Sequence, residues 1–447
     1  MPAPSPVTDT IAAIATPAGS GGIGVLRLSG PQALAIARVF LGSPAKPRHA
    51  HRCRFRDAGG DVIDDGLLLA FPAPHSYTGE DVVELQAHGA PVLLAALLRR
   101  CIELGARHAR PGEFSERAFL NGKLDLAQAE AVADLIAAGS EAAARAAMRS
   151  LDGEFSRRVH ALGRQLVELR VYIEAAIDFP EEEIDFLRGD ELRARFAAVD
   201  LILHELLAGA RRGQRLRDGL RVAILGEPNV GKSSLLNALA GHDRAIVTAI
   251  PGTTRDVLLE HLDVDGLPVT VVDTAGLRET TDEVESEGIA RARREAAKAD
   301  LVLWVVDESR DSGPGARGAA SSRITVHNKL DLSDAEARIE RRADGTHVHL
   351  SAKTGAGLPL LRRVLREHAG LTEGSAGDFS ARARHVDALE RCRAALATAR
   401  AQALTDGHGE LAAEELRIAH EALGEITGRM RADELLGAIF ASFCIGK

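Results

Sequence analysis

The sequence predicts a multi-domain chain with an α+β N-terminal domain, an all-α helical domain and an α/β domain inserted into the helical one. Three observations predict this arrangement. Short apolar runs separated by Gly/Pro turns fill residues 1–119, and strands alternate with helices over residues 220–370. Segments rich in Ala, Leu, Glu and Arg, with apolar residues at helical spacing, lie on both sides of the alternating region.

The domain boundaries follow these changes of pattern, in a chain of 447 residues that is long enough for two or three cores. We expect the N-terminal domain at residues 1–119, the first helical part at 120–217, the inserted domain at 218–373 and the second helical part at 374–447. Basic residues 210–217 and Gly/Ser-rich residues 371–377 are the expected linkers. Because neither helical flank has an obvious core of its own, one interrupted domain is favoured over two separate helical units.

The N-terminal domain is expected to combine strands and helices. The strand candidates are residues 10–15, 24–28, 66–71 and 81–86, and the helix candidates are residues 31–40 and 90–104. Residues 19–24 fit G-x-G-x-x-G, but a dinucleotide-binding fold needs a helix directly after this motif. Since the next residues read as a strand, we interpret the glycine run as a tight turn between two strands.

The inserted domain begins with a phosphate-binding motif, because residues 226–233 fit G-x-x-x-x-G-K-[ST]. The motif follows an apolar run, residues 220–225, that predicts a buried strand, and a predicted helix at residues 234–239 follows it. Lys232 would reach the β/γ-phosphates, and the Ser233 hydroxyl would ligate Mg²⁺. The expected nucleotide contacts in this loop are Asn229, Val230, Gly231, Lys232, Ser233 and Ser234.

Three later motifs identify the nucleotide. Asp273 can hold Mg²⁺ through water at the end of the apolar run 269–272, and Gly276 can present its N–H to the γ-phosphate. Asn328 and Asp331 suit guanine, with Asp331 accepting from the ring N–H and the exocyclic amine. The other residues of these motifs are Thr274, Ala275, Lys329, Leu330 and the base-capping run Ser351, Ala352 and Lys353. Four motifs in this order predict a P-loop GTPase domain rather than a set of unrelated polar turns.

The residues that complete GTP hydrolysis are not selected by chemistry alone. Leu277 stands where many small GTPases carry a water-orienting glutamine, so that group must come from elsewhere. The candidates are Arg278, Glu279, Asp282, Glu283 and Glu285. The spacing also assigns no arginine to neutralise the negative charge that develops on the β–γ bridge of GTP in the transition state. The side-chain carbonyl of Asn229 could instead help bind a monovalent cation beside the phosphates. A switch-segment threonine can complete the Mg²⁺ shell; the segment consists of Thr248, Ala249, Ile250, Pro251, Gly252, Thr253, Thr254, Arg255 and Asp256.

Composition limits the partners and the location. The net charge is −9, whereas a protein that holds nucleic acid tightly by itself usually has a basic excess. Four widely separated cysteines argue against a disulfide framework or a zinc site. No apolar run approaches a membrane span of about 18 residues, so a cytoplasmic protein without membrane attachment is expected. The last four residues formally fit a prenylation box, but Gly446 and Lys447 are atypical there and we reject that interpretation. Polar, Gly-rich residues 307–322 are expected to form a mobile loop.

Taken together, the motifs resemble the bacterial MnmE (TrmE) family of tRNA-modification GTPases over essentially the whole chain. The resemblance is carried by residues 10–17, 21–27, 77–81, 110–114, 123–130, 251–256 and the terminal 443–447. It implies an N-terminal domain that dimerises and binds 5-formyl-tetrahydrofolate. It also implies a heterotetramer with the FAD- and NADH-dependent protein MnmG, which would carry much of the tRNA-binding charge. Together they would add an aminomethyl or carboxymethylaminomethyl group to C5 of the wobble uridine of certain tRNAs.

The resemblance also implies roles for individual residues. The positions that match K⁺ ligands are Asn229 and, through backbone carbonyls, Thr248, Ile250 and Thr253. Ser233 and Thr254 match Mg²⁺ ligands, and Glu285 matches a water-orienting glutamate, so that Glu285 and Lys232 are the expected catalytic residues of GTP hydrolysis. The positions that match folate-binding residues are Arg27, Glu84, Lys123 and Lys447. Cys444 matches a cysteine needed for modification, and a small buried thiol is the alternative reading of this residue.

Two other functions compete with this one. A regulatory GTPase of the ribosome-assembly kind shares the P-loop and Leu277. It would not explain the N-terminal domain or the terminal cysteine motif. A folate-dependent one-carbon transferase fits the N-terminal domain but leaves an intact set of GTP motifs without a purpose. A K⁺-stimulated GTPase acting in tRNA modification is therefore the leading hypothesis.

Overall fold

The computed structural model describes residues 9–178, 190–227, 229–241, 259–273, 299–309, 322–333, 335–371, 379–428, 439–440, 443 and 446. The chain divides into two compact units, which are described separately. Unit 1 contains Met1–Ala133 and Glu421–Lys447, and unit 2 contains Asp134–His420.

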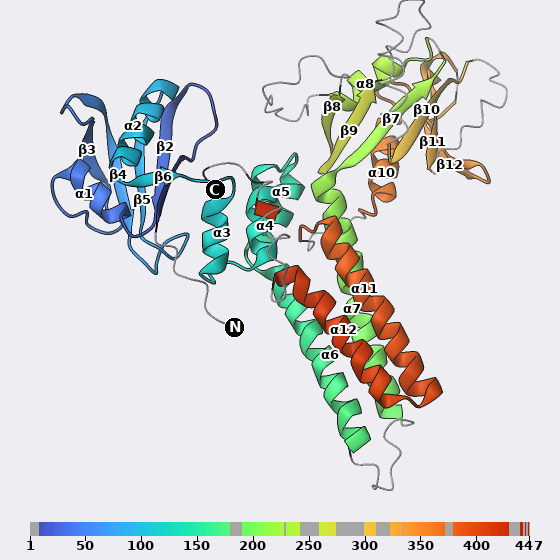
Figure 1. The fold of residues 1–447 in the computed structure, drawn as a ribbon. Coiled ribbons are helices and arrows are strands. Elements are labelled where there is room, and N and C mark those ends of the chain that lie inside the picture. Colours follow the sequence, from blue (N-terminus) through green and yellow to red (C-terminus); the bar gives the residue numbers. More distant parts are fainter. Residues whose placement is uncertain are drawn as a thin grey trace, which may run out of the picture. The chain divides into compact units, whose positions relative to one another are not determined.

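Unit 1 is built on a six-stranded sheet with the order β3-β4-β5-β2-β1-β6 (Figure 1). Its elements are β1 (Thr10–Ile14), β2 (Gly21–Ser29), α1 (Ala33–Leu41), β3 (His51–Arg56), β4 (Val62–Phe71), β5 (Val82–Gly89), α2 (Pro91–Glu103) and β6 (Ala106–His108). Neighbouring strands are antiparallel, except that β1 and β6 are parallel. The expected strands and helices correspond to β1, β2, β4, β5, α1 and α2. The sequence reading missed β3, whose apolar residues are only Cys53 and Phe55, and the three-residue β6.

The two faces of this sheet have different roles. Leu26 and Leu28 of β2 are buried in a core shared with α1 and α2. Because side chains alternate along a strand, Arg27 between them points to the opposite face. That face carries a smaller apolar cluster that includes Ala13 and Phe114. A polar side chain is thus placed against the less extensive core of unit 1.

The C-terminal residues pack in unit 1, on α3 (Glu113–Leu120) and α4 (Leu126–Ile136). One apolar cluster is formed by Leu126, Ala129, Ile439, Phe440 and Phe443. Gly446 lies against β1, where an added Cβ would come within 2.4 Å of the Ile14 carbonyl oxygen. With φ at +98°, this close approach to another backbone requires glycine.

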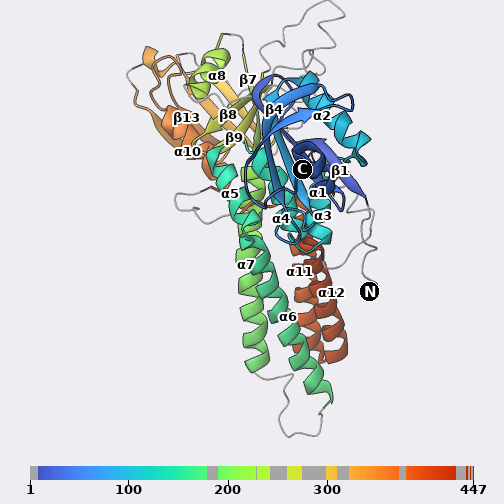
Figure 2. The ribbon, with the colours of Figure 1, turned by 90° about the vertical axis from the view of Figure 1, so that its left-hand side faces the viewer.

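The helices of unit 2 form a bundle interrupted by the inserted domain (Figures 1 and 2). They are α5 (Glu141–Leu151), α6 (Glu154–Asp178), α7 (Asp190–Asp218), α11 (Ala383–Ala401) and the first part of α12 (Gly409–Thr427), with a π-helical turn at Gln402–Asp406. The Phe155 ring of α6 stacks on Phe379, with ring centroids 4.5 Å apart, and Arg211 of α7 pairs with Glu390 of α11. Helices from both sides of the insertion therefore share one core, which confirms the interrupted helical domain.

The expected linker at residues 210–217 is wrong as a separate segment, because α7 continues through it to Asp218. Ala210, Gly213 and Leu216 are buried at a spacing of three residues, which is helical. The basic residues between them were read as a composition break, yet they only form the more exposed side of the helix. Residues 372–377 of the second expected linker lie outside the described residues, as do residues 310–321 of the expected mobile loop.

Both chain segments that border the inserted domain are tied to Asp134 of α4. Its Oδ1 accepts hydrogen bonds from Arg217 Nε at 2.8 Å and from a terminal guanidinium nitrogen of Arg382 at 2.7 Å. Arg217 is near the end of α7, and Arg382 directly precedes α11. The Asp134 side chain is only 5% exposed. One buried carboxylate therefore binds both the chain segment that enters the inserted domain and the segment that leaves it.

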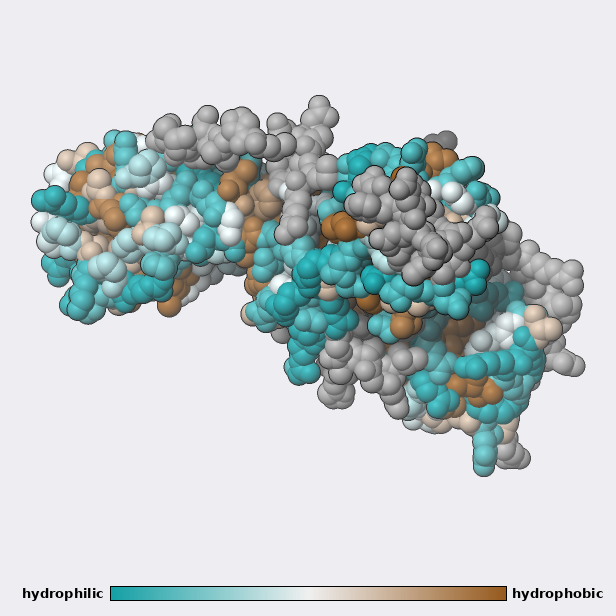
Figure 3. All heavy atoms as spheres, turned by 90° about the horizontal axis from the view of Figure 1, so that it is seen from below, coloured by the Kyte–Doolittle hydropathy of each residue, from teal (hydrophilic) through white to brown (hydrophobic). Residues whose placement is uncertain are grey.

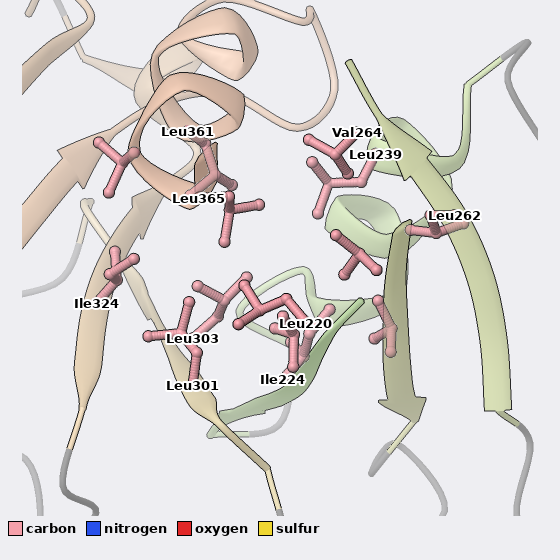
Figure 4. Packing of buried hydrophobic residues seen from close by; sticks show 14 of the residues in the cluster. Leu220, Ile224, Leu239, Leu262, Val264, Leu301, Leu303, Ile324, Leu361 and Leu365 are labelled. Carbon is pink, nitrogen blue, oxygen red and sulfur yellow. The ribbon is translucent and has the colours of Figure 1, made fainter. Parts of the chain in front are cut away.

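The inserted domain contains a seven-stranded sheet with the order β12-β13-β11-β10-β7-β9-β8. Its elements are β7 (Leu220–Gly226), α8 (Lys232–Ala240), β8 (Leu259–Val264), β9 (Leu267–Asp273), β10 (Leu301–Asp307), β11 (Arg323–Asn328), the 3₁₀ turn Leu330–Leu332, β12 (Arg338–Arg342), β13 (Gly345–His349) and α10 (Leu358–His368). The five central strands are parallel, and β8 and β12 pair antiparallel at the edges. Side chains from these strands meet α8 and α10 in one core (Figure 4). The predicted α/β domain is confirmed.

The glycine run at residues 19–24 was expected to be a tight turn between two strands. Residues 21–24 start strand β2 with a register irregularity, so the run is not only a turn; a strand follows it, which excludes the dinucleotide motif. On the face shown in Figure 3, the described residues are mainly hydrophilic, with smaller hydrophobic areas between them. Among the described residues, no helix is long and apolar enough to cross a membrane. Cys53, Cys101 and Cys392 are free and buried, and Cys444 lies outside the described residues.

Candidate nucleotide-binding site

The phosphate-binding loop lies between β7 and α8, at the carboxyl end of a central parallel strand, where open α/β sheets bind ligands. α8 begins at Lys232, and the N–H groups at the start of a helix favour binding of an anion. Lys232 Nζ donates to the carbonyl oxygens of Gly226 and Glu227, at 2.9 and 2.8 Å. The ammonium is therefore held over the loop, where a bound nucleotide would place its phosphates.

The loop conformation depends on its own residues. Asn229 and Gly231 have φ values of +64° and +96°, in the left-handed region. An added Cβ on Gly226 would lie 2.2 Å from the carbonyl oxygen of Val305 on the neighbouring strand. Glycine at 226 lets β10 approach the loop, and asparagine at 229 tolerates a conformation that most side chains avoid.

Asn328 joins the phosphate-binding loop to the loops that would recognise the base. Its Nδ2 donates to the Val230 carbonyl oxygen at 2.8 Å, and its Oδ1 accepts from the Ala352 N–H at 2.9 Å. The side chain is buried. One amide thus connects three of the four predicted motifs.

Asp331 and Ser351 form a second connection between the two base-recognition motifs. The Ser351 hydroxyl donates to Asp331 Oδ1 at 2.6 Å, and this bond lowers the pKa of Asp331 below its usual range. Asp331 is therefore an ionised acceptor at neutral pH, as recognition of the guanine donors requires. Lys353 follows in the same turn.

Asp307 was expected to begin the mobile loop at residues 307–322 and was not predicted as a site residue, but it is the last residue of β10. Its Oδ2 accepts from Lys329 Nζ at 2.6 Å, and the bonds from Lys329 and Ser309 lower its pKa to about 2. The ion pair fixes Lys329, whose φ is +68°. An acidic residue directly after the apolar run 301–306 was the signal that could have found it.

Other predicted residues lie at the edges of the described ranges or outside them. Asp273 ends β9 next to β7, in register with Ile224, but its side chain lies outside the described part. Ser233 and Ser234 lie in the first turn of α8. The predicted residues outside the described ranges are Thr248, Ala249, Ile250, Pro251, Gly252, Thr253, Thr254, Thr274, Ala275, Gly276, Glu285, Cys444 and Lys447.

A separate polar site lies on the N-terminal sheet. Arg27 of β2 and Glu84 of β5 are register partners, and the guanidinium donates two hydrogen bonds to Glu84 Oε1, at 3.0 and 2.9 Å. The Arg27 guanidinium lies 5.5 Å from the centre of the Tyr77 ring and 5.9 Å from that of Phe114. Two charged groups and two rings could recognise a polar aromatic ligand.

Lys123 and Gly446 each contact a segment next to residues of this polar site, along the chain or in the sheet. Lys123 Nζ donates to the Pro74 carbonyl oxygen at 3.1 Å, three residues before Tyr77. Gly446 lies against Ile14, next to Ala13, which is the register partner of Arg27. Tyr77 and Phe114 belong to the motif segments 77–81 and 110–114, and no sequence signal marks their rings as neighbours of Arg27.

Comparison with known proteins assigns both halves of the chain to one family. The family "GTP-binding protein TrmE N-terminus" matches residues 10–123, and "MnmE helical domain" matches residues 126–444. A tRNA modification GTPase MnmE of Pseudomonas aeruginosa is 56% identical, covering 98% of this chain and 99% of its own. One of Xanthomonas campestris is 57% identical over the same shares.

Among solved structures, the G domain of the T. maritima FeoB iron transporter is 27% identical and covers 34% of this chain and 98% of its own. Its TM-score is 0.25, which is too low to add to the assignment. The two family matches and the full-length relatives are sufficient: the chain belongs to the MnmE (TrmE) family of tRNA modification GTPases.

Proposed function

We propose that this protein hydrolyses GTP to GDP and phosphate with K⁺ as an activating ion, and that this turnover drives tRNA modification. With the flavoprotein MnmG, it would add an aminomethyl or carboxymethylaminomethyl group to C5 of the wobble uridine. The one-carbon unit would come from 5-formyl-tetrahydrofolate. The protein would act as a homodimer through its N-terminal domain and in the cytoplasm.

The observation that carries this proposal is the Arg27–Glu84 pair under two aromatic rings, in a chain that also holds a GTPase site. A guanidinium suits the carboxylates of a folate, and a carboxylate suits the donor edge of its pterin. Lys123 and the terminal Lys447 would add two cations. Because Gly446 packs on β1, the proposal requires the last residues to approach the strand beside Arg27.

The residues of the GTPase site would have separate tasks. Lys232 and the N-terminus of α8 would bind the phosphates, and Ser233, Asp273 and Thr254 would hold Mg²⁺. Asn328 and Asp331 would select guanine, together with the Ser351-Ala352-Lys353 backbone. Mg²⁺, when bound, neutralises charge between the β- and γ-phosphates. Glu285 would orient water, and Cys444 would serve the modification.

Asn229 is the described residue on which the K⁺ proposal can be tested. It lies in the phosphate loop with φ at +64°, and its side chain would ligate K⁺ together with the carbonyls of Thr248, Ile250 and Thr253. Alanine would add strain at this φ, so Asn229→Gly is the cleaner variant. We expect faster GTP hydrolysis in K⁺ than in Na⁺ at matched ionic strength, and loss of this difference in Asn229→Gly.

Glu285→Ala serves as the companion variant, with slow hydrolysis expected in both salts. Equal rates of the unaltered protein in K⁺ and Na⁺ would contradict the cation mechanism and favour a regulatory switch GTPase. GDP affinity, measured on each variant, shows whether the site still binds nucleotide.

The folate proposal is tested by binding of 5-formyl-tetrahydrofolate to Arg27→Ala, measured by calorimetry. We expect at least about a tenfold loss of affinity, since a charge-assisted contact contributes about 1.5–3 kcal/mol. The matched control is Arg52→Ala, because Arg52 forms a similar cross-strand pair with Asp65 at 2.9 Å but is largely exposed. Equal affinities for the two variants would place the folate elsewhere. Folate binding without GTP turnover would instead favour the one-carbon transferase.

A further inference from the structure

A cluster of histidine and glutamate side chains adjoins the guanine motifs and has no role in the contacts above. Glu308 follows β10, and His327 of β11 directly precedes Asn328. His349 of β13 is the register partner of His327 on the adjacent parallel strand, two residues before Ser351. Three separate strands thus bring these groups together, and the sequence alone did not mark them.

The three side chains converge on one point. Glu308 Oε2 lies 2.8 Å from His327 Nδ1, and Glu308 Oε1 lies 3.0 Å from His349 Nδ1. The three donor atoms lie within 4.8 Å of one another. His349 is only 2% exposed, and Glu308 and His327 are partly buried. Two imidazoles and a carboxylate are a donor set for Zn²⁺ and neighbouring transition metals.

The other ring nitrogens face a second set of polar groups. His327 Nε2 lies 3.0 Å from His347 Nδ1, and His347 Nε2 lies 3.1 Å from Asp344 Oδ1. His349 Nε2 lies 3.5 Å from Glu340 Oε1 and forms no hydrogen bond, although it is buried. Glu340 is itself held by Arg338 and Arg342.

Counting hydrogens shows that neutral imidazoles cannot satisfy this arrangement. A neutral imidazole has one N–H. If His327 and His349 donate from Nδ1 to Glu308, their Nε2 atoms are acceptors. His349 Nε2 then faces the Glu340 carboxylate, which is also an acceptor, and is left buried without a donor. His347 would have to donate to both His327 and Asp344, which only an imidazolium can do.

A cation shared by Glu308 and the two Nδ1 atoms removes both conflicts. The N–H of His349 moves to Nε2 and points to Glu340, and the N–H of His327 points to His347. His347 then donates to Asp344 as a neutral ring. Metal-bound histidines usually donate their second N–H to a carboxylate or a similar acceptor, as each ring would here.

We propose that Glu308, His327 and His349 bind a divalent transition-metal ion, with Zn²⁺ as the best fit to two nitrogens and one oxygen. The two imidazole rings are stacked, with centroids 4.3 Å apart and planes 8° from parallel. Binding therefore requires the rings to turn about their Cβ–Cγ bonds, so that both Nδ1 lone pairs point to the ion. The donor atoms would settle at about 3.3 Å from one another, as metal–ligand distances of about 2.0–2.1 Å require.

The position of this site gives the ion a structural effect on guanine binding. Leu350 N donates to the His327 carbonyl oxygen at 2.9 Å, between the two histidine strands. Asn328 and Ser351 continue directly from these strands into the base-recognition loops. The ion would fix the strand ends from which both loops start, and so would raise GDP affinity.

The test is Zn²⁺ titration of the full chain by calorimetry, in excess Mg²⁺ and after treatment with a chelator. Co²⁺ provides a second probe, because a tetrahedral site gives visible absorption bands. We expect one Zn²⁺ per chain that is lost in Glu308→Gln and His327→Gln. Glu340→Gln, which changes only a neighbour of His349, should weaken Zn²⁺ affinity by about tenfold or more.

The matched control is His88→Gln, because His88 Nδ1 also pairs with a carboxylate, Asp64, at 2.8 Å but belongs to no group of three donor side chains among the described residues. It should bind Zn²⁺ as the unaltered protein does. GDP binding and thermal unfolding in the absence of Zn²⁺ show that each variant is folded. Equal Zn²⁺ binding by the unaltered protein, Glu308→Gln and His327→Gln would overturn the proposal.

Discussion

At the scale of single residues, the nucleotide motifs are fitted to one another. An added Cβ on Gly231 of the phosphate loop would lie 2.2 Å from Asn328 Nδ2, which belongs to the base motif almost a hundred residues away. Asn328 reaches the loop only because Gly231 has no side chain. Each motif is readable in the sequence by itself, whereas this mutual fit is not.

A second residue-scale feature is the buried Arg117 of α3, whose side chain is 2% exposed. It pairs with Asp9, Glu80 and Glu113, at 2.8, 3.0 and 3.1 Å. Arg117→Leu would leave these carboxylates without their common partner. We therefore expect the unfolding free energy of unit 1 to fall by about 3–5 kcal/mol. Hydrogen exchange of peptides from β1 and α3 measures this loss. Arg52→Leu, at an exposed pair, should leave the same peptides unchanged.

The same ion cluster predicts how unit 1 responds to acid. Burial raises the pKa of Glu113, but hydrogen bonds from Arg107, the Arg110 N–H and Arg117 outweigh it and lower the pKa below 4.5. A carboxylate with a lowered pKa stabilises the folded state above its unfolded pKa, and this contribution disappears as the pH falls through the folded pKa. Exchange protection of α3 should therefore decrease below about pH 4.5. Glu113→Gln should remove most of this pH dependence; an unchanged slope would assign it to other groups.

At the scale of elements, parallel strands collect the functional residues at one edge of the sheet. β7, β9, β10, β11 and β13 all end there, so that their carboxyl ends lead into the phosphate loop, Asp273, Asp307, Asn328 and Ser351. Strand order determines which of these ends are neighbours. The histidine cluster is a product of the same arrangement, because β10, β11 and β13 are consecutive in the sheet.

The helical bundle offers an element-scale prediction at Gly213 of α7. Glycine inside a helix usually costs about 1 kcal/mol relative to alanine, so Gly→Ala should stabilise. Here the added Cβ would lie 1.9 Å from the Phe379 carbonyl oxygen, where the returning chain crosses α7. We expect Gly213→Ala to lower the midpoint of denaturant unfolding. Gly163→Ala in α6, whose Cβ would meet only the His420 ring at 3.5 Å, should keep or raise it; the opposite order would show that helix propensity dominates at both sites.

At the scale of the whole molecule, the inserted domain is connected to the bundle through two chain crossings that share Asp134. Asp134→Ala would remove the carboxylate that Arg217 and Arg382 share. We expect the unfolding free energy of unit 2 to fall by about 3 kcal/mol or more, as for other broken buried ion pairs. GDP affinity should be retained, because the described partners of Asp134 are Arg217, Ser380 and Arg382, and none of these three is a predicted nucleotide-binding residue.

The control for this variant is Glu390→Ala, which breaks the Arg211–Glu390 pair between α7 and α11 at a more exposed position. Chemical unfolding followed by hydrogen exchange of α7 and α11 compares the two. If both variants lower the unfolding free energy equally, the Asp134 ion pairs stabilise the bundle no more than the more exposed Arg211–Glu390 pair does, and the prediction is wrong.

The sequence by itself determined the family, the domain order and the identity of the nucleotide. Phosphate binding and guanine recognition require particular residue types at short spacing, and the strands beside them are apolar enough to be read directly. β3 and β6 were missed because short or basic strands give a weak periodic signal, and residues 210–217 were misread because composition alone does not end a helix.

Only the tertiary structure decided which distant groups meet. The Arg27–Glu84 pair, the fit of Gly231 to Asn328, the Asp134 crossings and the Glu308–His327–His349 cluster all depend on strand order and register. Long-range pairing is set by packing of whole faces, and local residue patterns carry little information about it. The functional loops were therefore predictable one at a time, and their assembly was not.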